Sequence, residues 1–220
     1  MKKADVLVIG GSAAGPVAGI SCRRRYEDKT VILVRKEEQV LIPCGIPYIY
    51  GTVWSSTKNL IPDALVVNNG IELVKGEAVE VDREKKTVTL SDGNTFSYKK
   101  LVLATGSSPL VLPIPGIDKE NVFVAKKDVP YLNNMLGTLN DAQDIVIIGG
   151  GFIGCEMSAF FAGVGVETHL FARGGRLLGR EDGEIEKVFQ SEFEKEVHTH
   201  CHAGLVDLQW DGSVFTATFD

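Results

Sequence analysis

The most reactive side chains in this chain are four cysteine thiols, which lie far apart in the sequence. They are Cys22, Cys44, Cys155 and Cys201. No two of them form a CxxC pair, and their spacing lacks the density of a disulfide framework. Because disulfides persist in oxidising compartments, this usage indicates a reducing environment, and we expect a cytoplasmic protein.

Cys44 stands in the segment PCGIP, which suits chemistry better than the other three positions. A helix beginning at about Gly45 would place the positive end of its dipole beside the sulfur and favour the reactive thiolate. Pro47 fits an early helical position, where its missing N–H has no partner to lose. The alternative is a buried, inert thiol, the usual state of an isolated cysteine and the one expected for Cys22 and Cys155.

A GxGxxG pattern is formed by Gly149, Gly151 and Gly154, between an apolar strand at 145–148 and a helix at 152–162. The first glycine makes a tight turn, the second admits a pyrophosphate, and the third lets the helix pack closely on the strand. The N–H groups at the start of the helix then face the phosphates. In this context the pattern predicts a dinucleotide site.

An earlier turn repeats the design less completely, with Gly10, Ser12 and Gly15 where three glycines would stand. Gly11, Ala13 and Ala14 keep the loop small. Alone, this turn fits a nucleotide site or a purely structural crossover equally well.

In many dinucleotide sites, an acidic residue about 20 positions after the glycine turn binds a ribose hydroxyl, and neither turn of this chain has one. That place falls near Arg35 and Lys36 after the first turn, and at Ala172 and Arg173 after the second. An arginine there favours a 2′-phosphate, so the second site could accept NADPH. The alternative is that Arg173 is a solvated loop residue.

Two further groups of polar residues have weaker functional interpretations. His198, His200 and His202 alternate along a predicted strand beside Cys201, but no second cluster completes four ligands, so no metal is predicted. Residues 23–25 are three arginines at the end of the first helix, where positive charge suits the helix dipole.

The two glycine turns belong to an internal repeat of strand, helix and strand. The first copy has strands at 6–9 and 31–34, and the second has strands at 145–148 and 168–172. This repeat predicts an α/β fold with two Rossmann-like dinucleotide-binding units, in which helices cover parallel sheets in three layers.

Further elements are predicted between and after the repeats. Strands are expected at 71–75, 78–82, 87–90 and 101–104, with a turn at 91–93, and the proline-rich residues 112–116 resemble a linker. A charged helix is expected at 182–197, with apolar residues at helical spacing. A hairpin at 205–210 and 213–219 turns at Asp211 and Gly212.

The composition excludes two classes of partner. The 220 residues are 44% hydrophobic and carry a net charge of −6, with acids and bases mixed along the chain. Without a basic stripe, nucleic acid is not expected. No segment approaches the roughly 18 apolar residues of a membrane span, and Asp5 interrupts the apolar start that superficially resembles a secretory signal.

Four segments together resemble the pyridine nucleotide-disulfide oxidoreductases over nearly the whole chain. They are VLVIGGSAAG, VLIPCGIPYIYG, LVLATGSSP and IVIIGGGFIGCEMS, in that order. PCGIPY is most similar to the branch containing NADH oxidases, coenzyme A disulfide reductases and related polysulfide or persulfide reductases. That family binds FAD on the first unit and NAD(P)H on the second.

The resemblance implies two sets of cofactor-binding residues. The implied FAD set is Gly10, Gly11, Ser12, Ala13, Ala14, Gly15, Arg35, Lys36, Pro43, Val79, Ala104, Thr105 and Gly106. The implied NAD(P)H set is Gly149, Gly151, Phe152, Ile153, Gly154, Glu156 and Arg173. In coenzyme A reductases, basic residues on the first helix meet substrate phosphates, which is the functional alternative for residues 23–25.

The resemblance also makes Cys44 the expected catalytic residue of an NAD(P)H oxidoreductase. Disulfide-cycling relatives carry a second cysteine five positions on, where this chain has Ile49. Electrons would pass from nicotinamide through flavin to this single thiol, and on to oxygen, peroxide, coenzyme A disulfide or polysulfide.

Family members are about twice as long as this chain and are expected to be homodimers. The resemblance implies an FAD-binding domain at 1–112 and an NAD(P)H-binding domain at 113–220, with the later FAD-completing and dimerisation regions absent. We therefore also consider a catalytically incomplete nucleotide-binding fragment. A third alternative is a flavin reductase of a protein carrier, which needs no thiol.

Overall fold

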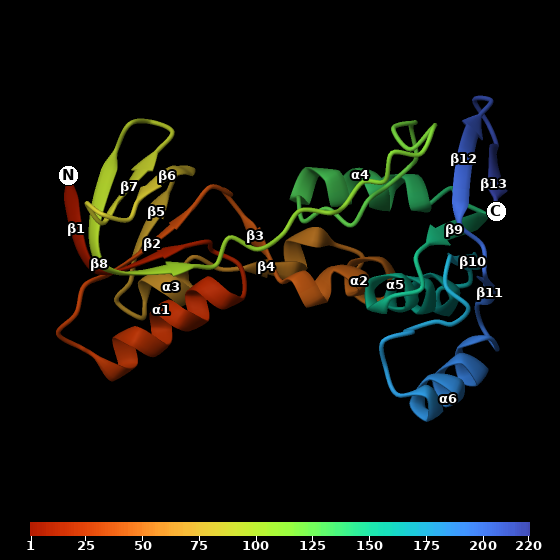
Figure 1. The fold of residues 1–220 in the computed structure, drawn as a ribbon, viewed down its shortest axis with the longest axis horizontal. Helices are drawn as coiled ribbons and strands as arrows, with labels where there is room; N and C mark the ends of the chain where they lie inside the picture. The colour runs from red at the N-terminus through yellow and green to blue at the C-terminus, as the bar shows by residue number, and fades with distance from the viewer. The chain divides into compact units, whose positions relative to one another are not determined.

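The computed structural model describes residues 1–220, which form two compact units. The first unit comprises residues 1–45 and 59–108, and the second comprises residues 46–58 and 109–220. Both units combine helices with parallel strands, which confirms the α/β fold class (Figure 1). None of the helices is long and apolar enough to cross a membrane.

The first unit is built on a six-stranded sheet with the order β5-β2-β1-β8-β7-β6. Strand β1 pairs in parallel with both β2 and β8, and β2 pairs in parallel with β5, whereas β6 and β7 are antiparallel. The strands are β1 (Lys2–Ile9), β2 (Val31–Arg35), β5 (Glu72–Lys75), β6 (Ala78–Asp82), β7 (Thr87–Leu90) and β8 (Thr95–Leu103). Because β1 has parallel neighbours on both sides, its carboxyl end lies at a switch point, where such sheets bind ligands.

Apolar side chains cover both faces of this sheet. Val8, Leu33 and Val66 form a cluster on one face, and the helices α1 (Ala14–Arg25) and α3 (Ala64–Val67) lie on a common side in Figure 1. Leu7 and Val88 belong to a second cluster that includes β7. Because β2 is buried on both faces, its residues 31–34 are all apolar.

A short segment that includes Cys44 leaves the first unit and returns to it. It begins and ends with the antiparallel pair β3 (Val40–Leu41) and β4 (Leu60–Ile61). Between these strands lie η1 (Pro43–Gly45), α2 (Ile46–Tyr48), η2 (Ile49–Val53) and η3 (Ser56–Asn59).

The second unit has a three-stranded parallel sheet with the order β11-β10-β9. Helices α5 and α6 pack on β10 through a core that contains Cys155, Leu170 and Phe193. The elements are α4 (Val129–Leu139), β9 (Asp144–Ile148), α5 (Phe152–Gly163), β10 (Glu167–Ala172), α6 (Gly183–Phe193), β11 (His198–Cys201), β12 (Leu205–Trp210) and β13 (Phe215–Phe219).

The predicted hairpin at the end of the chain is confirmed, since β12 and β13 pair in antiparallel fashion. The Asp211 carboxylate accepts hydrogen bonds from the backbone N–H groups of Ser213 and Val214, both at 2.8 Å, and these bonds lower its pKa. Gly212 supplies the required positive φ of 101°.

Two parts of the fold differ from the sequence prediction. Strand β8 begins at Thr95, six residues before the expected start, because its first residues pair with β7. Helix α4 was not predicted, although Asp128 caps it by accepting from the Tyr131 N–H at 2.9 Å. Its short apolar pattern is interrupted by two asparagines and a glycine, which weaken the helical signal.

Candidate functional site

The first glycine turn lies at the carboxyl ends of β1 and β8. The Gly10 N–H donates to the Val34 carbonyl at 2.8 Å, and the Ala104 N–H donates to the Ile9 carbonyl at 2.8 Å. A Cβ on Gly10 would lie 2.0 Å from the Ala104 oxygen, and one on Gly15 would lie 1.8 Å from the Gly10 oxygen. Both glycines are therefore required by close backbone packing, and Gly10 also has a φ of 115°.

Helix α1 leaves this turn without a side-chain cap, so no side chain satisfies its first N–H groups. Ala13 and Ala14 are exposed at its start, as are Thr105 and Gly106 after β8. The Ser12 hydroxyl does not face this opening; its Oγ donates to the Leu41 carbonyl at 3.4 Å. The turn thus presents small residues and free N–H groups, as a pyrophosphate site requires.

Arg35 lies beneath this turn and is 2% exposed. Its guanidinium donates to the carbonyls of Glu37 and Glu38, both at 2.9 Å, and to the Asp63 carboxylate at 2.5 Å. Its Cδ would lie 2.5 Å from a Cβ on Gly11. The side chain is therefore bound to protein atoms and supports the turn, a role that the sequence pattern did not indicate.

The other residues implied for FAD lie in different places. Lys36 is exposed, with its Nζ 3.5 Å from the Glu77 carboxylate. Val79 is exposed on β6, an edge strand separated from β1 by β7 and β8. Pro43 precedes the thiol on η1. Of the implied residues outside the turn, Arg35, Ala104 and Thr105 lie against it.

Cys44 is exposed on η1, which starts at Pro43. The expected helix from Gly45 onward is therefore wrong in its details: the chain forms a 3₁₀ turn, three α-helical residues and a π turn. Two prolines within five residues prevent a regular helix here, because each removes an N–H donor. Cys44 lies inside the first turn, and its side chain is open to solvent.

Asn59 holds the Cys44 turn in place, and sequence patterns gave no sign of this role. Its backbone oxygen accepts from the Ile42 N–H at 2.9 Å, and its Nδ2 donates to the Ile42 oxygen at 3.0 Å. The side chain is buried, and a Cβ on Gly45 would lie 1.9 Å from its Oδ1. Gly45 is needed for this close approach.

The second glycine turn has the same backbone path with more open space. Gly149 has a φ of 117°, and a Cβ on Gly149 or Gly151 would have no atom within 4 Å. A Cβ on Gly154 would lie 1.9 Å from the Gly149 oxygen, so Gly154 permits close packing of helix on strand. Helix α5 starts at this turn with no side-chain cap. These features match the roles expected for the three glycines.

The remaining residues implied for the nicotinamide nucleotide are exposed around this turn. Phe152 and Ile153 are about two-thirds exposed at the start of α5, and Glu156 is exposed one turn later. Arg173 follows β10 directly and is exposed at the carboxyl edge of the sheet. Glu167 begins β10 and lies at the opposite edge.

The other cysteines and the histidines lie outside these openings. Cys155 is buried, as expected, and desolvation raises its pKa to about 11. Cys22, for which burial was also expected, is only partly buried and packs against the core of the first unit. His198 and His200 share one face of β11, as predicted, and the ring of His169 on β10 lies between them at centroid distances of 4.8 and 5.5 Å. His169 was missed because it is about 30 residues away in sequence. Burial and the two neighbouring imidazoles lower the pKa of His200.

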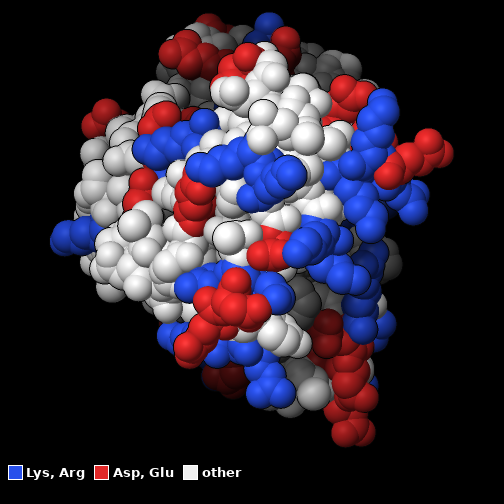
Figure 2. Space-filling view, turned by 90° about the vertical axis from the view of Figure 1, so that its left-hand side faces the viewer, with Lys and Arg blue, Asp and Glu red and all other residues white.

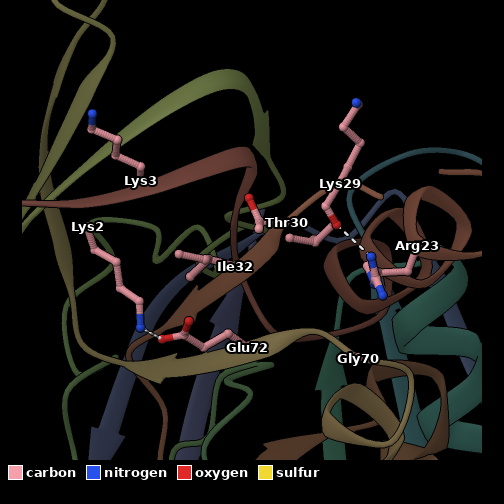
Figure 3. Close-up of a pocket in the computed structure, with 9 residues that line it drawn as sticks. Lys2, Lys3, Arg23, Lys29, Thr30, Ile32, Gly70 and Glu72 are labelled. Carbon is pink, nitrogen blue, oxygen red and sulfur yellow. Dashed lines mark hydrogen bonds and ion pairs between the residues drawn. The ribbon is translucent and has the colours of Figure 1, made fainter. Parts of the chain in front are cut away.

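Basic side chains, interspersed with acidic ones, cover this face of the first unit (Figure 2). A cavity of about 350 Å³ lies at the amino end of its sheet (Figure 3). Its lining includes Lys2, Lys3, Arg23 and Lys29. Arg23 donates through Nη1 to the carbonyls of Glu27 and Lys29, at 2.7 and 2.6 Å. Both carbonyls lie in the loop after α1, which ends at Arg25, so Arg23 holds this loop and does not cap the last carbonyls of the helix.

The chain is thus an α/β protein in which each of two units carries a strand-turn-helix of the dinucleotide-binding type. Residues 4–219 match the family model described as pyridine nucleotide-disulphide oxidoreductase, and the chain belongs to this family. Membership confirms the resemblance found in its motifs.

Two curated relatives show the similarity in sequence. The chain is 33% identical over 205 residues to an NAD(P)H sulfur oxidoreductase (CoA-dependent) from Pyrococcus abyssi, covering 89% of this chain and 46% of the relative. It is 31% identical over 201 residues to an NADH oxidase from Enterococcus faecalis, covering 87% and 44%. The chain therefore spans about half the length of these relatives.

Solved structures show the similarity in fold. An NAD-dependent persulfide reductase from A. fulgidus matches with a TM-score of 0.85 at 26% identity, over 97% of this chain and 42% of that one. A water-forming NADH oxidase from Lactobacillus brevis, bound to NADH, matches with a TM-score of 0.84 at 23% identity, over 100% and 51%.

Proposed function

We propose that this chain carries the two nucleotide-binding units of an FAD-dependent NAD(P)H oxidoreductase, with Cys44 as its redox-active thiol. The observation that carries the proposal is that both glycine turns lead into helices without side-chain caps. Helices α4 and α6 are instead capped by Asp128 and Asp182. Uncapped N–H groups behind a glycine turn are the donors that a pyrophosphate needs.

The residues present fit both cofactors. The open space at Gly149 and Gly151 leaves room for a pyrophosphate, and the exposed Phe152 and Ile153 offer apolar surface beside it. In the first unit, residues 10–15 and 104–106 would hold FAD, and the buried Arg35 would keep the turn in shape. When bound, FAD accepts a hydride from NAD(P)H and passes the electrons on.

Cys44 is proposed to receive these electrons and to pass them to a small acceptor. Its exposure gives a small thiol or peroxide access to the sulfur. A mixed disulfide between Cys44 and a small thiol would take up two electrons and two protons and release two thiols. The names of the relatives, which include NADH oxidase and CoA-dependent sulfur oxidoreductase, support oxygen or sulfur compounds as acceptors.

The domain assignments 1–112 for FAD and 113–220 for NAD(P)H are kept as part of this proposal, as are a cytoplasmic location and a homodimeric full-length protein. The two compact units of the structure differ from these assignments, because residues 46–58 belong to the second unit.

The test is an anaerobic titration of the purified chain, reconstituted with FAD, with NADH and NADPH. We expect stoichiometric flavin absorbance that bleaches on addition of the reduced nucleotide. Mass spectrometry of Cys44 should then show a bound thiol or an oxidised sulfur. Cys44→Ser should lose the ability to reduce the small acceptor, whereas Cys201→Ser should keep it. Absence of flavin binding would contradict the proposal and favour a nucleotide-binding fragment. Full activity of Cys44→Ser would favour a flavin reductase.

A further inference from the structure

Three imidazoles share the face of the second unit's sheet that lies opposite helices α5 and α6. His169 stands on β10, and His198 and His200 stand on the neighbouring strand β11. The parallel register pairs His169 with His198 and Phe171 with His200. The alternate residues of β10, such as Leu170, belong to the core that α5 and α6 cover. The sheet therefore gathers three side chains that titrate near neutral pH on one face.

The imidazole of His169 links a carboxylate on its own strand to a histidine on the next. Its Nε2 lies 3.3 Å from Glu167 Oε1, and its Nδ1 lies 3.2 Å from His200 Nε2. A neutral imidazole carries one N–H and one acceptor nitrogen, so His169 can donate to Glu167 through Nε2 and accept from His200 at Nδ1. This contact joins β10 and β11 through side chains, in addition to their backbone pairing.

Ring stacking holds these nitrogens opposite each other. The ring centroid of His200 lies 4.2 Å from that of Phe171, and the centroid of Phe171 lies 3.9 Å from that of Phe219 on β13. His169 lies between His198 and His200, and its ring is within 21° of parallel to both. Because stacked rings bury apolar surface, turning His200 away from His169 would cost its contact with Phe171.

Glu167 is the carboxylate that faces the three imidazoles. Its Oε1 lies 3.3 Å from Nε2 of His169 and 3.9 Å from Nε2 of His198. One carboxylate balances one imidazolium. A second positive charge in the cluster would therefore be unpaired, and it would be repelled by the first.

The neighbouring strands contribute apolar side chains to this face. Val146 and Ile148 on β9 lie beside β10 in register, and Phe219 extends the stack from β13. Two other carboxylates lie near the cluster in sequence but are bound elsewhere. Glu194 accepts from a threonine hydroxyl at 2.6 Å, and Asp220 accepts from a backbone N–H at 2.9 Å. Glu167 is thus the charge that decides how many protons the imidazoles can hold.

We propose that the contact between His169 and His200 is a pH-sensitive latch, which holds the edge strand β11 against β10 at neutral pH and releases it in acid. A first proton can be placed on His169, because Glu167 faces the charge and Nδ1 can then donate to a neutral His200. A second proton on His200 would oppose two N–H groups and two positive charges. Since β11 pairs only with β10, it can separate without disturbing β9. The latch goes beyond the proposed function, because it needs no nucleotide.

The direction of the pH dependence follows from the surroundings of His200. Burial and the neighbouring imidazoles lower its pKa from the ordinary value of 6.5. Separation of β11 would remove these neighbours and return the pKa toward 6.5. The separated strand therefore binds the proton first, and the latched state loses stability as the pH falls below this value. At higher pH both states are neutral at His200, and the latch stays closed.

The test follows amide hydrogen exchange of β11 in the intact chain by mass spectrometry, between about pH 7.5 and about pH 5. Protection factors, which correct for the pH dependence of intrinsic exchange, should fall by up to about tenfold per pH unit below about pH 6.5, because opening is linked to uptake of one proton. Amides of β9 serve as the internal control and should keep their protection. Constant protection of β11 over the whole range would overturn the proposal.

His200→Phe separates titration from packing, since a phenyl ring keeps the stack on Phe171 but binds no proton. We expect β11 to stay protected at acid pH in this variant. His202→Gln is the control, because the His202 imidazole lies against Gly175 outside the cluster, and its pH dependence should match the wild type. If His200→Phe still opens in acid, or if His202→Gln abolishes the opening, the latch is wrong. If His200→Phe fails to fold, His169→Phe provides the same comparison from the other strand.

Discussion

Cys44 and Cys155 carry the same thiol in opposite surroundings. Cys44 is exposed on the turn held by Asn59, whereas Cys155 is buried beneath the second glycine turn with a raised pKa of about 11. Burial disfavours the charged thiolate, which is the reactive form. The environment, and not the residue type, therefore makes Cys44 the candidate for redox chemistry.

Alkylation at pH 8 should separate these two thiols. We expect iodoacetamide to modify Cys44 in the folded protein and to leave Cys155 unmodified, while denaturant exposes all four cysteines. Peptide mass spectrometry gives the modified sites. Rapid labelling of Cys155 in the folded state would contradict the buried position.

The raised pKa of Cys155 also gives stability a defined pH dependence. In the unfolded chain a thiol ionises at roughly pH 8.5, whereas the folded protein keeps Cys155 protonated up to about pH 11. The unfolded state therefore loses its proton first, and the free energy of unfolding should fall as the pH rises through this interval. Cys155→Ala should remove this part of the decline in urea titrations.

Arg35 is the residue whose role changes most between sequence and structure. Arg35→Met should destabilise the first unit by about 2 kcal/mol, because two carbonyls and Asp63 lose a buried donor. Lys36→Met is the matched control, since Lys36 is exposed and its ion pair is long, so its effect should stay within about 0.5 kcal/mol. Chemical unfolding followed by far-UV circular dichroism measures both. Equal effects of the two substitutions would contradict the structural role of Arg35.

At the scale of elements, the two strand-turn-helix motifs pack helix on strand in the same way, but the surroundings of their turns differ. Gly10 packs against the Ala104 carbonyl, whereas Gly149 has open space around it. Gly15 and Gly154 have the same neighbour in their own units, the carbonyl of the first glycine of the turn. The third glycine is thus fixed by packing, and the middle position is left for a ligand.

Substitution of the second and third glycines should therefore have different consequences. The Cβ of Gly151→Ala would have no atom within 4 Å, and the φ of −87° suits alanine. This substitution should therefore change the free energy of unfolding by at most about 1 kcal/mol but weaken nucleotide binding. Gly154→Ala would place its Cβ 1.9 Å from the Gly149 oxygen and should unfold the second unit. Thermal melts with and without NADPH compare the two variants. Normal nucleotide affinity in Gly151→Ala would argue against a phosphate at this position.

At the scale of the whole molecule, the two units differ in charge. The first contains 14 Lys and Arg against 12 Asp and Glu, and the second contains 9 against 17. In the proposed function, a nucleotide polyphosphate would therefore be attracted by local arginines and N–H groups in the second unit, against an unfavourable overall charge. This binding should weaken less with added salt than binding to a broadly basic surface would.

The two units should respond separately to their proposed nucleotides. Trp54 and Trp210 both belong to the second unit, so tryptophan fluorescence reports its unfolding alone. NADPH at a hundred times its Kd should stabilise this unit by about 2.7 kcal/mol and raise the fluorescence midpoint. FAD should raise the unfolding midpoint of the first unit, which circular dichroism detects and tryptophan fluorescence does not. A fluorescence midpoint that does not respond to NADPH would count against the assignment of the second unit.

The sequence by itself determined the α/β class, both glycine turns, most strands and the position of the candidate thiol. These features depend on local patterns: apolar runs for strands buried on both faces, glycines where the backbone turns sharply, and Asp-Gly where a hairpin reverses. Such patterns act over a few residues, so they are visible without knowledge of the fold.

Only the tertiary structure decided which residues meet across long stretches of sequence. Asn59 holds the Cys44 turn from 17 residues beyond Ile42, His169 joins two histidines of another strand, and Arg35 is bound beneath the first glycine turn. Glu186 is buried against Arg176 even though its own helix pattern predicts an exposed carboxylate. Burial and pairing of polar groups depend on partners that the chain supplies only after folding, and hydrophobic periodicity carries no record of those partners.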